Sequence, residues 1–294
     1  KELSREYLKY TLFLVLAALG GLITPSINSF FVTAKMGLES TGVFTIATYV
    51  TSVIGMAYVS LYNISQPLIS HAIHNKDIEE AEKLSKKVSY HQLIVATLVF
   101  LIIWINIDLF FDILPNGNLY SKGKYVILIL GISKVIFSTL NISSSVLSFS
   151  KYFYYSLFFS FLLTGIAIIL NLILIPQYGI EGASFATLAS YVLVFALQLL
   201  LVKWKVGVNI MTWHHLTLVV GALILFVANY LWNRFLTPLV QISFDNALLA
   251  TITDCIIRSV LFGTISILAL YFSGISEEIN GIIRKILKPI WKTR

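Results

Sequence analysis

Charged residues are scarce in this sequence: they make up 12% of its 294 positions, whereas hydrophobic residues make up 57%. A soluble domain carries about twice that share of charge. So few charged side chains cannot provide a chain of this length with a polar coat facing water. We therefore expect lipid to surround most of the protein.

Cysteine is almost absent, and residue types arranged for chemistry are equally rare. The one thiol, Cys255, lies inside an apolar run and excludes a disulfide framework or a cysteine metal cluster. A Gly-rich phosphate loop and a nucleophile elbow are also missing. His71 and His74 fall at a predicted helix end, and the adjacent His214 and His215 cannot share one helical face, so we expect surface histidines. No metal, cofactor or enzymatic activity is expected.

Long apolar runs take the place of these features. Eight of them are long enough to cross a hydrocarbon core about 30 Å thick, which takes about 20 residues. Continuous runs predict helices rather than the alternating strands of a membrane barrel. The sequence thus predicts an all-α integral membrane protein with about eight transmembrane helices. The predicted spans are residues 7–31, 42–70, 90–111, 125–149, 153–175, 183–202, 214–236 and 248–273.

The net charge of +7 is distributed between these runs. That pattern indicates membrane topology rather than a nucleic-acid surface, which needs its cations on one face. About 15 lysines and arginines fall on the side that holds both ends of the chain, against about four on the other. The imbalance predicts a multi-pass protein of the bacterial cytoplasmic membrane with both termini in the cytoplasm.

Two charged segments, residues 75–88 and 276–291, place apolar side chains along one side of a helix. We expect both to lie on the inner membrane surface, where anionic lipid headgroups are the simplest partners. The second belongs to a basic amphipathic tail over residues 274–294.

Polar residues follow one face of the span at residues 125–149. They share that face because their spacing matches the 3.6-residue period: Lys134, Ser138, Asn141, Ser145 and Ser148. Lys134 lies near the middle of the membrane, where a lysine costs about 2.5–3.5 kcal/mol unless it meets water, a partner or a ligand. The face predicts a hydrated cavity or substrate path, although hydroxyl groups also join packed helices.

Asp254 and Arg258 have opposite charges and i,i+4 spacing in the last span. We expect them to neutralise each other as a structural ion pair. The alternative is a lipid groove with Arg258 on a phosphate.

A short phrase occurs twice, at residues 36–50 and again, 142 positions later, at residues 178–192. Both copies begin on the predicted outer side, where the chain turns back into the membrane. Gly37 in one copy, and Pro176, Gly179 and Gly182 around the other, predict the turns. Common ancestry and shared helix-entry physics explain the repeat equally well. We expect the repeat to serve the fold rather than the substrate.

Residues 173–192 contain Ile-Pro-x-Tyr-Gly-Ile-x-Gly-Ala and a small-residue run. This stretch resembles the O-antigen/polysaccharide flippases of the multidrug/oligosaccharidyl-lipid/polysaccharide exporter superfamily. A second stretch, residues 42–47, resembles their Gly-x-Tyr-x-x-Ala region, with Phe44 in place of the common Tyr. The resemblance covers about residues 7–205.

The resemblance implies a second six-helix lobe at residues 1–205 and two additional transmembrane helices at residues 206–273. A partner lobe would precede this chain, and the two lobes would move a lipid-linked oligosaccharide outward by alternating access. Lys134 would attract its pyrophosphate or acidic sugars. Four residues would border the cavity: Asn28, Thr45, Thr48 and Tyr49. Asn28 stands where the family often has an acidic residue, which weakens a role in cation coupling.

Three alternatives stay open from the sequence. A drug/cation antiporter of the same superfamily would favour an acidic cavity. A membrane glycosyltransferase or polymerase would need a large loop with catalytic groups, and the internal loops here are only about 20 residues long. A half-transporter without a partner lobe would act in binding or as a scaffold.

Overall fold

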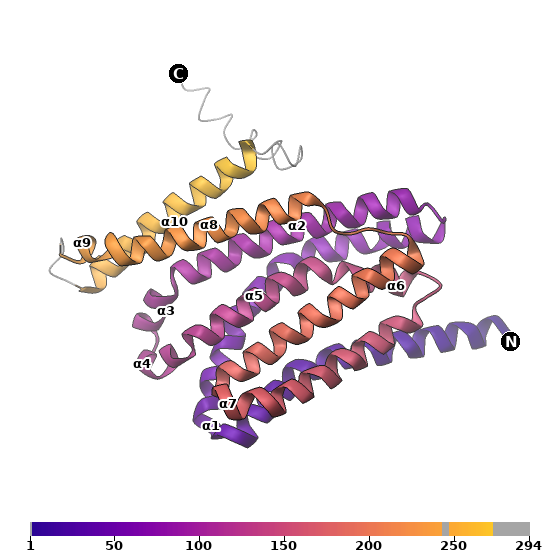
Figure 1. Cartoon of the computed structure of the whole chain (residues 1–294), viewed down its shortest axis with the longest axis horizontal. Coiled ribbons are helices and arrows are strands. Elements are labelled where there is room, and N and C mark those ends of the chain that lie inside the picture. Colours follow the sequence, from indigo (N-terminus) through magenta and orange to yellow (C-terminus); the bar gives the residue numbers. More distant parts are fainter. Residues whose placement is uncertain (1, 243–246, 273–294) are drawn as a thin grey trace. The chain divides into compact units, whose positions relative to one another are not determined.

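The structure of the chain is a computed structural model that describes residues 2–242 and 247–272 (Figure 1). Within these ranges the regular elements are all helices. The predicted tail at residues 274–294 lies outside the described residues. The all-α prediction is confirmed.

Two of the helices, α1 (Glu2–His74) and α7 (Tyr154–Leu201), are far longer than a membrane is thick. At 1.5 Å per residue, even α7 is about 70 Å long, against a core of about 30 Å. Each bends at a glycine with positive φ, Gly37 at 83° and Gly179 at 61°. Both helices are therefore pairs of helices joined at a turn, and the two turns lie in the two copies of the repeated phrase.

The remaining elements follow in chain order: α2 (Ile78–Ile105), α3 (Ile107–Ile113), α4 (Gly117–Tyr120), η1 (Ser121–Gly123), α5 (Lys124–Leu140), α6 (Ile142–Phe149), the π-helix η2 (Val202–Val206), α8 (Trp213–Phe235), α9 (Thr237–Ile242) and α10 (Ala247–Phe272). Six helical segments among the described residues are long and apolar enough to cross a membrane, and two of them contain the glycine turns. The count of eight spans stays a prediction.

The segment at residues 75–88 is not a separate helix on the membrane surface, as the sequence suggested. Asp77 accepts a hydrogen bond from the backbone N–H of Glu80 at 3.0 Å, and α2 then begins at Ile78. Ala81 and Ser85 are fully buried, so this charged stretch is the first part of a long helix that packs on the protein. The amphipathic pattern was real, but its apolar side faces the core rather than lipid headgroups.

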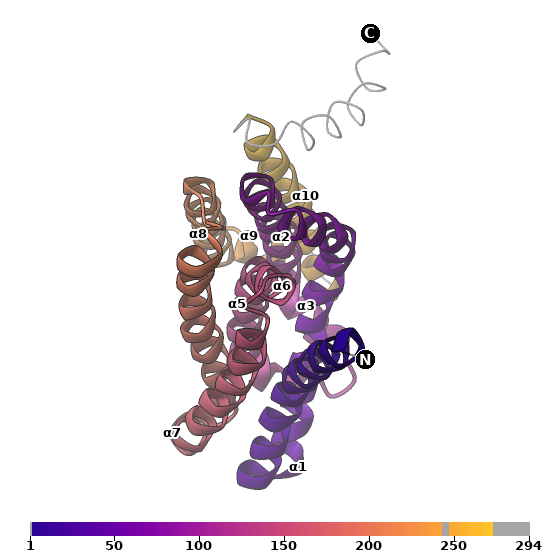
Figure 2. The same ribbon diagram turned by 90° about the vertical axis from the view of Figure 1, so that its right-hand side faces the viewer.

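The chain divides into two compact units. Among the described residues, unit 1 comprises residues 2–100 and 114–215, and unit 2 comprises residues 101–113, 216–242 and 247–272. In unit 1, α1 and α7 lie side by side, with α5 and α6 packed against both (Figures 1 and 2). Residues 101–113, which include the end of the third predicted span, belong to unit 2 rather than to the predicted lobe.

One hydrophobic core cluster of unit 1 joins the end of α1, the start of α2, α6 and the end of α7. Its buried members are Ile69, Ala72, Ile73, Ala81, Ile142, Val146, Leu147, Phe159, Val194, Val202, Val208 and Ile210. Val208 and Ile210 belong to the connection between η2 and α8, so that connection is fastened to the core.

The turns of α1 and α7 touch. The methyl carbon and sulfur of Met36 lie 3.2 and 3.4 Å from the point where a Cβ on Gly179 would stand. On α7, a Cβ on Gly182 would overlap the backbone of Leu174, so the chain returns past its own preceding turn at a distance that only glycine allows. Gly179 makes the turn, Pro176 lies inside the helix before it, and Gly182 permits the close return.

Candidate functional site

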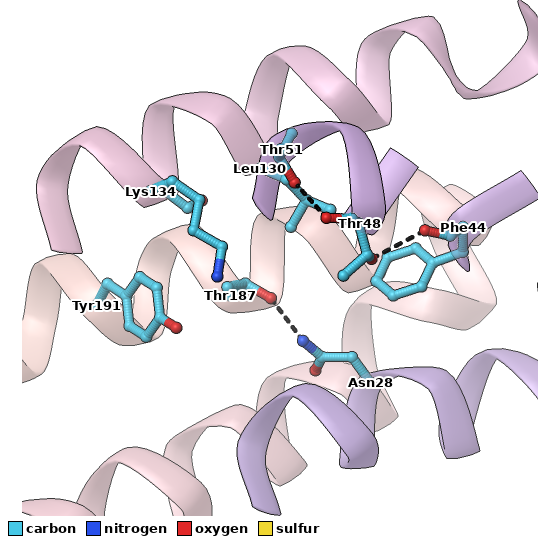
Figure 3. A pocket seen from close by; sticks show the side chains of 9 residues that line it. Asn28, Phe44, Thr48, Thr51, Leu130, Lys134, Thr187 and Tyr191 are labelled. Atoms are coloured by element: carbon cyan, nitrogen blue, oxygen red, sulfur yellow. Dashed lines mark hydrogen bonds between the residues drawn. The ribbon is translucent and has the colours of Figure 1, made fainter. Parts of the chain in front are cut away.

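A pocket in unit 1 lies between α1, α5 and α7 (Figure 3). It encloses about 400 Å³ of empty space, part of it open to the surroundings. Its lining combines hydroxyl, amide, aromatic and aliphatic side chains with one cation: Asn28, Phe44, Thr48, Thr51, Leu130, Ser133, Lys134, Thr187 and Tyr191.

Lys134 is the charged group of this pocket. It projects from α5, and its ammonium group points between α7 and the first half of α1 (Figure 3). No carboxylate lines the pocket. Among the described residues, the ammonium group has no hydrogen-bond or ion-pair partner. An uncompensated cation within a membrane span is costly, so its position here marks a place for water or for an anionic ligand.

Two side-chain amides and one hydroxyl form a buried network beside Lys134. Asn28 on α1 donates from Nδ2 to Oγ1 of Thr187 at 2.7 Å, and its Oδ1 accepts from Nδ2 of Asn171 at 2.7 Å. Asn171 also donates to the carbonyl of Ala167. Its own Oδ1 is buried and has no hydrogen-bond partner among the described residues. The network joins both halves of α7 to the first half of α1.

Two threonines of the pocket satisfy their O–H groups locally. Thr48 donates to the carbonyl of Phe44 at 2.9 Å, and Thr51 to the carbonyl of Ala47 at 3.0 Å. Their oxygen lone pairs are left to accept from a ligand. Tyr191 is buried, with its ring 5.2 Å from that of Phe137, so aromatic packing fixes the position of its hydroxyl.

The structure brings together only part of the predicted cavity. Asn28, Thr48 and Lys134 line the pocket, whereas Thr45 and Asn141 do not. Tyr49 is 68% exposed and does not line the pocket. Ser138 is buried and donates to the carbonyl of Val135 on its own helix.

The rest of the polar face of α5 and α6 joins helices. Ser145 accepts from Nε2 of Gln66 at 2.7 Å and hydrogen-bonds to the hydroxyl of Tyr62 at 2.9 Å. Ser148 hydrogen-bonds to Ser156 on α7 at 3.0 Å. For these serines the packing alternative holds, and the polar face leads to the pocket only at Lys134.

Sequence reasoning did not select Thr187 and Tyr191. Both lie in the second copy of the repeated phrase, which was expected to serve only the fold. The signal was available in the pattern: Thr187 and Tyr191 are one helical turn apart and four and eight residues after Ala183, on the face that packs against Asn28. Their small neighbours allow the close approach of α1.

In unit 2, Asp254 and Arg258 form the expected ion pair, with Nη2 2.8 Å from Oδ2. The side chains are 1% and 3% exposed. The indole N–H of Trp232 donates to the carboxylate of Asp254 at 2.8 Å, and the hydroxyl of Thr237 donates to the same carboxylate at 3.1 Å. The guanidinium of Arg258 donates to the side chain of Asn233. The carboxylate therefore has three donors from three elements, which favours the structural role over a lipid groove.

His215 is not the surface residue that the sequence suggested. It is buried, and its Nδ1 accepts a hydrogen bond from the backbone N–H of Thr212 at 3.2 Å. Thr212 precedes α8 and His215 is the third residue of that helix, so the pair has the arrangement of a capping box. Because Nδ1 accepts, Nε2 carries the proton and donates to Oγ of Ser89 at 3.1 Å. Ser89 in turn donates to the carbonyl of Thr139. His215 thus fastens the start of α8 to α2 and α5. Among the described residues, no group of histidine, cysteine and acidic residues forms a metal site.

A family of known proteins resembles this chain in sequence, and solved structures resemble it in fold. The family model described as MatE matches residues 22–173, just over half of the chain. No curated protein matches the chain by sequence.

Solved structures resemble the fold. The Vibrio cholerae MATE transporter VcmN in its bent form has a TM-score of 0.61 and 20% identity, over 90% of this chain and 64% of that one. An outward-facing multidrug resistance MATE family transporter of the MOP superfamily has a TM-score of 0.57 and 17% identity, over 90% and 64%.

A third structure is a MOP superfamily transporter from Pyrococcus furiosus, for which reversed polarity of the binding pocket is said to suggest a different function. Its TM-score is 0.53 and its identity 16%, over 89% of this chain and 61% of that one. This chain therefore spans less than two thirds of the length of these transporters.

Proposed function

The chain belongs to the MatE family, whose members are membrane transporters rather than enzymes, and from this premise we propose that it moves a lipid-linked oligosaccharide outward across the bacterial cytoplasmic membrane. The observation that carries the proposal is Lys134, a cation in a pocket that no carboxylate lines. A lipid-linked sugar carries a phosphate or pyrophosphate, and an ammonium group within a membrane span attracts such an anion.

The other polar groups of the pocket suit the sugar part of such a substrate. Thr48 and Thr51 supply acceptor lone pairs, and Tyr191 supplies a hydroxyl that both donates and accepts. Sugar hydroxyls need partners of both kinds. Phe44 and Tyr191 add aromatic faces, on which the apolar face of a sugar ring packs.

A drug/cation antiporter is the alternative, and multidrug transport by one of the similar structures favours it. A positively charged drug would be repelled by Lys134, because no acidic side chain of the pocket lining offsets its charge. The Pyrococcus furiosus transporter, described as having a binding pocket of reversed polarity that suggests a different function, is a precedent for a change of pocket polarity within the superfamily.

We propose further that the chain is one half of the transport path. Residues 1–205 form the second of two lobes and residues 206–273 two additional helices, in keeping with its coverage of 64% of the similar transporters. The pocket is open on one side, and the walls contributed by this chain alone do not enclose an oligosaccharide. The wall contributed by a partner lobe would complete it, and rocking of one lobe against the other would expose it alternately to each side.

The test is replacement of Lys134 in the full-length protein. Lys134→Ala removes the cation, and we expect surface polysaccharide to fall at least tenfold, since a hydrogen bond to a charged group contributes about 1.5–3 kcal/mol. Lys134→Arg keeps the charge and should retain most export. The measurement is cell-surface polysaccharide normalised to the amount of transporter in the membrane.

The matched control is Lys122→Ala, which removes an exposed lysine whose ammonium group lies 3.5 Å from the carboxylate of Glu39. We expect its export to equal that of the unmodified protein. Normal polysaccharide export by Lys134→Ala would contradict the proposal. Enhanced efflux of cationic drugs by Lys134→Ala, with export unchanged, would instead establish the antiporter alternative.

A further inference from the structure

An exposed surface of lysine and tryptophan lies at one end of unit 1. We define the Trp204 surface as Lys203, Trp204 and Lys205 of η2; a second exposed tryptophan, Trp213, stands at the start of α8. Trp204 and Trp213 are 78% and 75% exposed. Apolar side chains along the spans are also exposed to lipid, but tryptophan prefers the headgroup layer, where its ring is apolar and its N–H is polar.

The backbone beneath this surface is held firmly. Val208 and Ile210, between the two tryptophans, are buried in the core cluster of unit 1. The backbone N–H of Asn209 donates to the carboxylate of Glu82 on α2 at 2.9 Å. Gly207, with φ of 86°, ends η2 and directs the chain into this connection. The exposure of the tryptophans is therefore a fixed feature of the fold and not the result of a loose loop.

Charge lies next to the aromatic faces. The ammonium group of Lys205 stands 4.1 Å from the centroid of the Trp204 ring, and Lys203 is exposed on the neighbouring position. A second pair of this kind, Lys151 over Tyr152 at 5.1 Å, borders the same core cluster. A lysine packed on an aromatic ring can hold its ammonium group in the polar headgroup layer while the ring lies in the less polar layer beneath.

The position along the helices defines the environment. η2 ends the apolar helix α7, and Trp213 begins the apolar helix α8, so both tryptophans stand where a membrane span meets its headgroup layer. The connections at this end contain most of the lysines, which places them on the predicted cytoplasmic side. The cytoplasmic leaflet carries the anionic lipids.

We propose that the Trp204 surface is a binding site for the phosphate headgroup of an anionic phospholipid, with Lys203 and Lys205 on the phosphate and the indole ring of Trp204 beside the glycerol and upper acyl chains. The site is separate from the transport pocket and stands whatever the pocket carries. Its charge is complementary to an anionic headgroup, and the ring of Trp204 matches the chemistry of the membrane interface. A soluble acidic protein would offer charge alone and would leave this ring in water.

The test counts lipids bound to the purified full-length protein by native mass spectrometry, with phosphatidylglycerol and phosphatidylcholine offered at equal concentration. We expect preferential retention of phosphatidylglycerol. Each lysine near an anionic surface contributes about fivefold, so Lys203→Gln with Lys205→Gln should weaken phosphatidylglycerol binding about 25-fold. Trp204→Leu should weaken both lipids, because the ring contacts the part that they share.

The control is Lys122→Gln with Lys124→Gln, which removes two lysines from the opposite end of the unit. We expect it to retain phosphatidylglycerol like the unmodified protein, and equal melting temperatures would show that all variants fold. Unchanged binding by the Lys203 and Lys205 double variant would overturn the proposal, and so would equal retention of phosphatidylcholine. Full displacement by millimolar inorganic phosphate would also overturn it, because a free anion would then suffice.

Discussion

At the scale of single residues, the ion pair of α10 shows how a membrane helix accommodates two charges. Asp254 alone or Arg258 alone would be costly in lipid, but at i,i+4 each offsets the charge of the other. Trp232 and Thr237 donate hydrogen bonds to the carboxylate of Asp254, and the side chain of Asn233 accepts one from the guanidinium of Arg258. The pair therefore holds α8, α9 and α10 of unit 2 together through hydrogen bonds as well as charge.

Removing one partner of this pair should cost more than removing both. Asp254→Leu leaves a buried guanidinium without a counter-charge, and we expect the free energy of unfolding to fall by about 3–5 kcal/mol. Asp254→Leu combined with Arg258→Met removes both charges and should recover most of that loss. The measurement is thermal unfolding of the purified protein in detergent. A double variant less stable than the single variant would contradict the structural role.

The sequence was informative about single residues where local spacing decides the outcome. The i,i+4 spacing predicted the pairing of Asp254 with Arg258, because both partners lie on one helix. It did not predict the contact of Asn28 with Thr187, which are 159 positions apart. The helical period assigns a residue to a face, but which helix that face meets depends on packing of the whole unit. The same limit explains why Ser145 was placed on a substrate path.

At the scale of elements, glycine decides where the long helices turn and how closely they return. Gly37 and Gly179 adopt positive φ, which other residues adopt only with strain. The repeated phrase predicted both turns from sequence because glycine is the residue that this backbone conformation requires. The charged start of α2 was misjudged, since its apolar side fits a membrane surface and a protein core equally well.

Two glycines of α7 provide a matched comparison. Gly182→Ala would place a Cβ against the backbone of Leu174, and we expect a loss of about 1–3 kcal/mol in stability together with reduced yield. Gly165→Ala introduces the same methyl group on the same helix, but no atom lies within 4 Å of it. That variant should be neutral or up to about 1 kcal/mol more stable, because alanine favours the helix.

Melting temperatures of the two variants, measured in the same detergent, give the comparison. Similar values for Gly182→Ala and Gly165→Ala would show that α7 does not return past Leu174 as closely as described.

At the scale of the whole molecule, the distribution of lysine and arginine predicts which ends of the helices face the cytoplasm. The prediction concerns the solvent around each connection and not the contacts between helices. The contacts between helices do not define which side faces the cytoplasm, because a helical bundle has the same internal contacts in either orientation. The charge pattern supplies it, since positive loops stay on the cytoplasmic side.

Labelling of single cysteines checks this orientation. Cys255 is buried, so its background reaction with a membrane-impermeant maleimide should be weak, and Cys255→Ser removes it. In that background, Lys122→Cys should react in intact cells, whereas Lys76→Cys should react only after the membrane is permeabilised. The reverse result would invert the predicted topology and would place the Trp204 surface in the outer leaflet.

The contact between Met36 and Gly179 links the two turns of unit 1 mechanically. If either helix pair changes its opening angle, the side chain of Met36 must move relative to the backbone at Gly179. We therefore expect the opening angles of the two hairpins to change together rather than independently. The unbranched thioether can follow such a motion without losing contact.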